Sequence, residues 1–222
     1  MVVTEIIQFG AEQLFDAHES RTTVDDRIQK TAKTLKGVKA LQNFVLGTQV
    51  QDKGAIQITS EWNGAKDYVN FETTAEFGSF IKSVRSSCGE PHSIFHVALN
   101  RSAFGSDGPA TANVVEFVQS YFPASHVTPE FQEKVKEDFL KFDEIYIKGA
   151  KGTVSFAFGW VLEEQEHEAI KGEKAKVFFV TRGWESMDHF ERSTKNDAYK
   201  EAIPILYAWN APWKMVGVYL NV

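Results

Sequence analysis

The 222-residue chain contains the same sequence pattern twice. Each copy has an opening strand-like segment, a Trp, a second aromatic residue and a closing strand-like segment. In the first copy these are residues 3–8, Trp62, Phe77 and residues 96–100. In the second copy they are residues 114–119, Trp184, Tyr199 and residues 217–221. The two aromatic positions are 15 residues apart in both copies. Because a repeated sequence encodes a repeated structural unit, this duplication predicts two similar modules. We expect the first module over residues 1–101, a linker over residues 102–112 and the second module over residues 113–222.

Composition and charge narrow the class of protein. With 43% hydrophobic residues, including 18 Phe, each module has enough apolar material for its own core. The net charge of -6 is spread along the chain and Lys and Arg form no run, so we expect no nucleic-acid partner. No segment reaches the roughly 20 apolar residues that span a bilayer, and Cys88 is the single cysteine, which suits a reducing compartment. We therefore expect a cytoplasmic protein with no membrane partner.

Apolar periodicity predicts the same order of elements in both copies. Strands are expected over residues 2–9, 43–51, 55–62 and 93–100, and over 113–122, 154–162, 175–181 and 214–221. Helices are expected over residues 23–35, within 63–84, after the N-cap Thr128, and from Ser186 to Trp209 with an irregular break at 194–197 and a bend near Pro204. The order β-α-β-β-α-β is the ferredoxin-like arrangement of the α+β class. Such a module has helices on one sheet face only, so the two modules can bury their other faces on each other.

Residues 183–193, with the sequence GWESMDHFERS, resemble the dimeric α/β-barrel superfamily. That group includes antibiotic-biosynthesis-monooxygenase-like and stress-responsive barrel proteins, in which the third strand ends in such a Trp and a helix follows. Residues 61–68 carry a looser version, EWNGAKDY. The resemblance implies that the two modules form an intramolecular dimeric α/β barrel. The chain would then be a pseudo-dimer, either a monomer or a homodimer in solution.

Four ionisable residues are candidate catalytic groups: His96, His189, Glu5 and Glu116. His96, on the last strand of the first copy, is either a general base near neutral pH or a hydrogen-bonded core residue. His189 lies in the first turn of a predicted helix, where the helix dipole would lower its pKa, or it is a surface residue. Glu5 and Glu116 recur at the same position of apolar strands. Either they are buried, in which case an isolated carboxyl group would have a raised pKa and could act as an acid or base, or they lie at exposed strand ends.

Six aromatic residues are candidate substrate contacts: Tyr68, Tyr219, Trp62, Trp184, Phe156 and Phe158. The two Trp are either packing anchors or ligand contacts, and Tyr68 stands where the other copy has His189. Phe156 and Phe158 share the bulky face of a strand whose other face, Ala157 and Gly159 included, is small. The small face either lines a ligand cavity or lets helices approach closely. The acidic segment 163–174 is either a solvated loop or a lid.

Within this superfamily are cofactor-free monooxygenases, polyketide cyclases, haem-degrading enzymes and proteins with no known reaction, so fold alone leaves function open. The leading hypothesis is an enzyme of secondary or aromatic metabolism without a metal or organic cofactor. It would act on an apolar, polyketide-like or aromatic small molecule by proton transfer and cyclisation, or by cofactor-free oxygenation. The alternative hypothesis is a non-catalytic stress-responsive or ligand-binding barrel, in which the interior is filled or the pocket is purely apolar.

Overall fold

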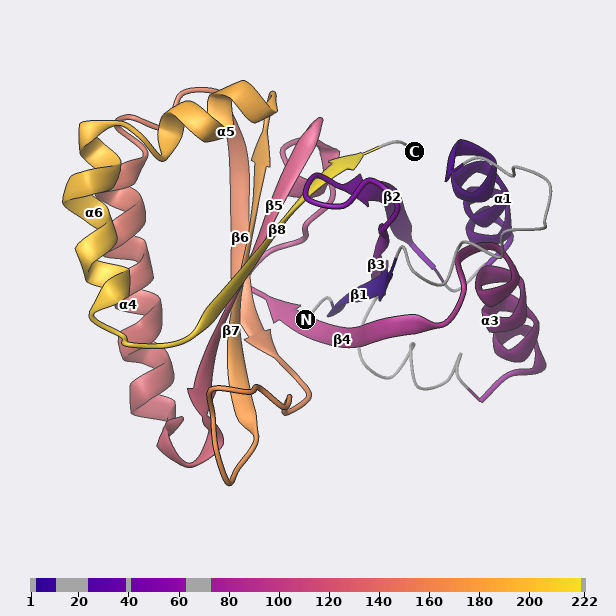
Figure 1. Ribbon diagram of the computed structural model, residues 1–222, viewed down its shortest axis with the longest axis horizontal. Coiled ribbons are helices and arrows are strands. Elements are labelled where there is room, and N and C mark those ends of the chain that lie inside the picture. The colour runs from indigo at the N-terminus through magenta and orange to yellow at the C-terminus, as the bar shows by residue number, and fades with distance from the viewer. Residues whose placement is uncertain (1–2, 11–23, 39–40, 63–72, 221–222) are drawn as a thin grey trace.

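The computed structural model describes residues 3–10, 24–38, 41–62 and 73–220, and these form a closed eight-stranded barrel (Figure 1). The strands are β1 (Val3–Phe9), β2 (Asn43–Gln49), β3 (Ile56–Trp62), β4 (Pro91–Leu99), β5 (Val114–Pro123), β6 (Thr153–Val161), β7 (Ala175–Trp184) and β8 (Trp213–Leu220). They follow one another around the barrel as β1-β3-β2-β8-β5-β7-β6-β4, and each strand is antiparallel to its neighbours. The predicted α+β class and the intramolecular dimeric α/β barrel are confirmed.

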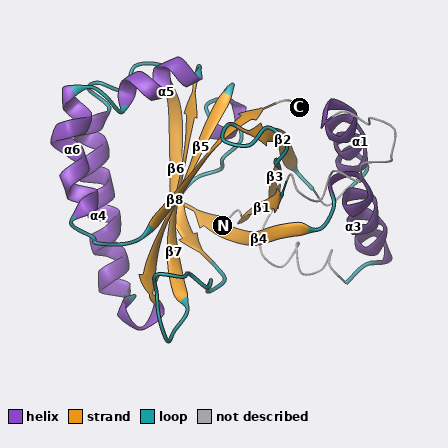
Figure 2. Cartoon of the chain, viewed as in Figure 1, coloured by secondary structure: helices purple, strands orange, loops and turns teal. Residues whose placement is uncertain are grey.

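Helices cover the outside of the barrel on two opposite sides (Figure 2). The described α-helices are α1 (Val24–Lys36), α3 (Ala75–Cys88), α4 (Pro129–Tyr146), α5 (Met187–Ser193) and α6 (Asp197–Tyr207). Helices α4, α5 and α6 lie on one side, and α1 and α3 lie on the other. As predicted, Thr128 caps α4 by accepting a hydrogen bond from the Phe131 N–H at 3.2 Å. As predicted, the helical segment after Ser186 is interrupted before residue 197, where Asn196 caps a separate helix α6. None of the described helices is long and apolar enough to cross a membrane.

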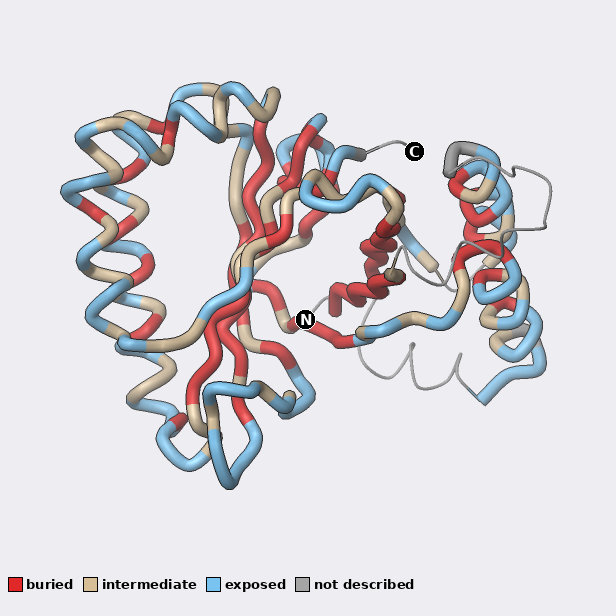
Figure 3. Tube along the Cα trace, in the orientation of Figure 1, coloured by how far each residue is buried: buried red, intermediate tan, exposed pale blue. Residues whose placement is uncertain are grey.

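Three apolar cores hold the barrel and its helices together. One core fills the barrel and includes Ile6, Phe95 and Phe179, and the other two lie between the sheet and the helices of each module. Burial is accordingly concentrated on the strands and on the inner faces of the helices (Figure 3). Each strand therefore presents alternate residues to the barrel interior and to a helix layer.

The two modules meet along β2–β8 and along β4–β6. A Cβ atom on Gly159 would lie 2.0 Å from the carbonyl oxygen of Ala98, so only glycine permits this approach of β6 to β4. Ala157, also on the small face of β6, is fully buried in the barrel core. At Ala157 and Gly159 the small face therefore packs inside the barrel and against the neighbouring strand, while Ser155 and Gly159 also line a hollow beside this strand.

The segment between the two copies packs into the barrel. Ala103 and Phe104 belong to the barrel core, and the buried carboxylate of Glu61 accepts hydrogen bonds from Ser102 Oγ at 2.8 Å and from the Ala103 N–H at 3.2 Å. The acidic loop between β6 and β7 also contributes to this core, because Ile170 packs against it. That loop therefore contacts the barrel.

Candidate functional site

A carboxylate and an indole are paired at equivalent places in the two modules. The Trp62 Nε1–H donates to Glu5 Oε2 at 3.2 Å, and the Trp184 Nε1–H donates to Glu116 Oε2 at 3.1 Å. Both Trp side chains are fully buried. The Trp residues are thus packing anchors that also hold a carboxylate. The sequence identified all four residues as candidates but did not predict that they pair.

In the first module the carboxylate is surrounded by partners. Glu5 lies opposite His96 on β4, and its carboxylate accepts a hydrogen bond from Ser60 Oγ at 2.8 Å and lies 3.6 Å from His96 Nε2. Glu163, just beyond β6, binds the other side of His96, through Nδ1 and through the backbone N–H at 2.9 Å. An imidazole thus lies between two carboxylates that come from different modules.

These two carboxylates determine the charge of His96. Burial alone would lower the pKa of His96, but the hydrogen bonds and negative charges of Glu163 and Glu5 raise it to about 9. The pKa of Glu163 is lowered in turn, because its contacts with His96 outweigh the effect of its burial. His96 is therefore an imidazolium at neutral pH and does not fit the role of general base that the sequence suggested.

The second module places different residues around its carboxylate. On one neighbouring strand, Gly217 lies opposite Glu116 at the position that His96 takes opposite Glu5. On the other neighbouring strand, Arg182 lies opposite Glu116 at the position that Ser60 takes opposite Glu5. Gly217 has no side chain to pair with the carboxylate. Glu116 instead faces a cavity of about 650 Å³ between the outer side of the sheet and helices α4 and α6.

This cavity has mostly apolar walls with a few polar groups, as expected of a small-molecule site. Its apolar lining includes Phe139, Phe142, Phe178, Val180, Ile203, Leu206 and Met215. Its polar lining includes Glu116, Ser120, Tyr146, Arg182, Thr194 and Tyr199. The polar set concentrates two opposite charges and two phenols in one apolar chamber.

The charges in the cavity are fixed by specific contacts. Burial raises the pKa of Glu116, while the positive charge of Arg182 and the hydrogen bond from Trp184 oppose that rise. Arg182 is 3% exposed, forms an ion pair with Asp143 and donates from Nη1 to Thr153 Oγ1 at 3.3 Å. A carboxylate with a raised pKa beside a fixed cation is suited to exchanging a proton.

Two tyrosines present phenolic groups to the same chamber. Burial and the nearby charge of Glu116 raise the pKa of Tyr146, and burial together with Tyr207 and Glu116 raises the pKa of Tyr199 to about 12. Tyr146 shares a 2.6 Å hydrogen bond with Ser193 Oγ, and its ring lies 5.2 Å from the guanidinium of Arg182. Both phenols stay protonated at neutral pH, and because Ser193 Oγ donates to the Phe190 carbonyl at 2.6 Å, the Tyr146 O–H is the donor to Ser193.

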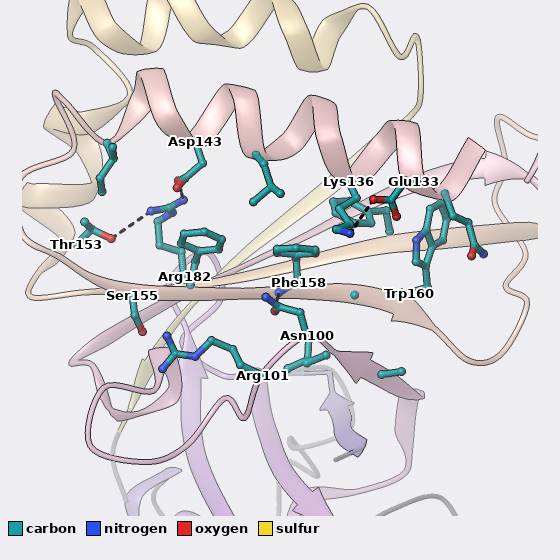
Figure 4. A pocket seen from close by; sticks show the side chains of 18 of the residues that line it. Asn100, Arg101, Glu133, Lys136, Asp143, Thr153, Ser155, Phe158, Trp160 and Arg182 are labelled. Carbon is teal, nitrogen blue, oxygen red and sulfur yellow. Dashed lines mark hydrogen bonds and ion pairs between the residues drawn. The ribbon is translucent and has the colours of Figure 1, made fainter. Parts of the chain in front are cut away.

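A second hollow, of about 920 Å³, lies between α4 and β6 (Figure 4). Phe156, Phe158 and Trp160 on β6 form its floor, so the two Phe candidates contact this groove. Figure 4 shows Arg182 directed at Asp143 on α4 and at Thr153 at one end of the groove. Arg182 lines both hollows.

The other predicted site residues lie elsewhere. His189 rests on Gly152 with its Nδ1 3.0 Å from Ser186 Oγ, and it is not among the described residues that line the Glu116 cavity. Tyr219 is 38% exposed on β8, near the junction with β2. Tyr68 lies outside the described residues. Of the predicted candidates in the described part of the chain, Glu116 alone lines this cavity, and Trp184 is connected to it through its hydrogen bond to Glu116.

Sequence reasoning missed Arg182, Tyr146 and Tyr199 as site residues. Arg182 precedes Trp184 by two positions, so the period of a strand puts both on the face that carries Glu116. That signal was available, but the predicted strand ended at Thr181, three residues before the end of β7 and one before Arg182. Tyr199 was recognised only as part of the repeat.

Neither the protein-family models nor the curated proteins include a match to this sequence. Solved structures do share its fold. An anthrone oxidase-like protein matches with a TM-score of 0.61 and 12% identity, over 100% of this chain and 92% of that chain. A candidate chlorite dismutase matches with a TM-score of 0.58 and 9% identity, over 100% and 95% of the two chains. A candidate monooxygenase from Fusobacterium nucleatum matches with a TM-score of 0.57 and 13% identity, over 99% and 92%.

Proposed function

Because the chain has the dimeric α/β-barrel fold, we propose that its second module is an enzyme site that removes a proton from an apolar aromatic or polyketide-like substrate. The proton transfer would begin either a ring closure or an oxygenation by dioxygen, without a bound metal or organic cofactor. The observation that supports this most is the carboxylate of Glu116, which faces an apolar cavity and has a raised pKa. A base with a pKa nearer neutrality removes a proton more effectively than an ordinary carboxylate.

The residues around Glu116 divide the work of such a step. Glu116 accepts the proton from an acidic C–H bond next to a carbonyl, and the electron pair of that bond moves onto the carbonyl oxygen. Arg182 supplies fixed positive charge, and the Tyr199 hydroxyl supplies a donor for the oxygen that becomes negative. The resulting enolate carbon then either attacks a second carbonyl of the same substrate, whose oxygen takes the proton back from Glu116, or transfers one electron to dioxygen. In the second case the substrate radical and superoxide combine, Glu116 protonates the resulting peroxide, and loss of water leaves a new carbonyl group. The apolar walls exclude water from the enolate.

Anthrone is a suitable test substrate, since it is flat and apolar and has an acidic C–H group, and since an anthrone oxidase-like protein shares this fold. We expect the protein to accelerate anthrone oxidation, measured by dioxygen uptake and by the absorbance of the quinone product. Glu116→Gln removes the base and should lower kcat by about 10² to 10⁴-fold. The matched control is Glu5→Gln, which changes the equivalent carboxylate in the first module and should leave kcat nearly unchanged.

Two results would contradict this proposal. One is an equal kcat for the wild-type protein and Glu116→Gln, and the other is no acceleration of anthrone oxidation by the wild-type protein. Either result would favour the non-catalytic, ligand-binding barrel. Binding of anthrone without turnover, measured by equilibrium dialysis, would identify that alternative directly.

A further inference from the structure

Two aromatic side chains stand exposed at the mouth of the Glu116 cavity. Tyr207 is 60% exposed and Trp213 is 57% exposed, and both line the cavity. They are the most exposed of the large hydrophobic residues in the described part of the chain. Large apolar groups that gather in solvent at a pocket entrance mark a surface that a ligand covers.

The backbone holds these two side chains in place. Tyr207 ends α6 and Trp213 begins β8, so a turn of five residues separates them (Figure 1). In this turn Asn210 has a left-handed φ of 48°, and its N–H donates to the Tyr207 carbonyl at 3.0 Å. The Pro212 carbonyl accepts from the Tyr121 N–H of β5 at 2.9 Å. The turn is thus anchored at both ends, and the two rings are preorganised.

Aromatic rings continue from the mouth towards the carboxylate. Tyr207 lies close enough to Tyr199 to help raise its pKa, and the ring of Tyr199 lies edge-on to Tyr146 with centroids 5.8 Å apart. The ring of Tyr146 lies 5.2 Å from the guanidinium of Arg182, which is opposite Glu116 on the sheet. A series of ring surfaces therefore runs from solvent to the charged end of the cavity.

We propose that Tyr207 and Trp213 form an outer subsite that stacks on the distal ring of a planar substrate with several fused rings. The reacting ring lies at Glu116, and this assignment of the inner end rests on the proposed function. A ligand with one ring fits at the inner end and leaves both exposed aromatics in water. A ligand with three fused rings extends towards the mouth and covers them.

Three probes of increasing length test the subsite: phenol, 1-naphthol and anthrone. Equilibrium dialysis in the absence of dioxygen gives a Kd for each without oxidation of anthrone, and we expect affinity to rise with ring number in the wild-type protein. Trp213→Ala should weaken the binding of anthrone about tenfold and leave the binding of phenol unchanged, because only anthrone loses a stacking partner. Trp213→Phe should restore most of the anthrone affinity. Tyr219→Ala, which removes another exposed aromatic of β8, is the matched control and should change no Kd.

The proposal is overturned if affinity does not rise along the series, or if Trp213→Ala weakens phenol as much as anthrone. It is also overturned if light scattering shows that the wild-type protein is a dimer and Trp213→Ala a monomer, since a second copy would then cover these rings. Because Trp213 is largely exposed, the variant should fold, and circular dichroism checks this. Dialysis measures binding and not turnover. It therefore tests the outer subsite independently of the role of Glu116, which is tested by kcat.

Discussion

The imidazolium of His96 should make the stability of the barrel depend on pH in a specific window. Contacts with Glu163 and Glu5 raise its pKa from 6.5 to about 9 in the folded chain. At about 1.4 kcal/mol per pKa unit, this shift corresponds to roughly 3 kcal/mol. Glu163 is 44% exposed, so solvent screening reduces the contribution to about 2 kcal/mol.

The sign of this effect follows from the direction of the shift. A raised pKa means that the folded state holds the proton more tightly than the unfolded state. The stabilisation is therefore fully present below pH 6.5 and is lost as the pH rises through about 9. His96→Gln removes the titrating group but keeps a hydrogen-bonding side chain. The difference in unfolding free energy between the wild-type protein and this variant should therefore shrink by about 2 kcal/mol between pH 6 and pH 10.

Urea unfolding at pH 6, 7.5 and 10, followed by circular dichroism, measures this difference. Other groups titrate in both proteins and cancel in the comparison. Glu163→Gln is the companion variant, and it should weaken the same pH dependence because it removes the stronger partner of His96. A difference between the wild-type protein and His96→Gln that stays constant over this pH range would refute the reasoning.

Two further predictions concern other contacts. Gly159→Ala should destabilise the protein by about 1–3 kcal/mol in urea unfolding, because the new Cβ clashes with the Ala98 carbonyl between the modules. Gly78→Ala, in the exposed helix α3 with nothing within 4 Å, is its control and should raise stability by up to about 1 kcal/mol. Trp184→Phe removes the hydrogen bond that favours the charged form of Glu116, so its pKa should rise further. The acidic limb of the kcat profile with anthrone should then move to higher pH, and an unshifted profile would argue against Glu116 as the base.

Local patterns in the sequence were sufficient to predict the elements and their order. The repeat, the alternation of residue types along the strands and the N-cap at Thr128 each depend on neighbouring residues, and each leads to the observed element. The recurrence of Glu5 and Glu116 likewise pointed to two carboxylates that each accept a hydrogen bond from a Trp.

Long-range pairing could not be predicted in the same way. Glu163 lies in an acidic run typical of a solvated loop, and its contact with His96 exists only because β6 pairs with β4. Arg182 becomes a site residue only when β7 extends to Trp184 and aligns it with Glu116. Such contacts depend on strand register around the closed barrel, which no single segment encodes.

The connection between the two copies limits how this protein can be divided. A duplicated chain invites separation into two fragments at its middle, yet Ser102 and Ala103 supply hydrogen bonds to Glu61, which is 2% exposed. A cut before Ser102 would place these donors on the second fragment. The first fragment would then contain the buried Glu61 carboxylate without the groups that hydrogen-bond to it. A cut at the exposed Ser106 would keep the donors with the carboxylate. Two fragments produced by a cut at Ser106 should therefore reassemble into the folded barrel more readily than two fragments produced by a cut before Ser102.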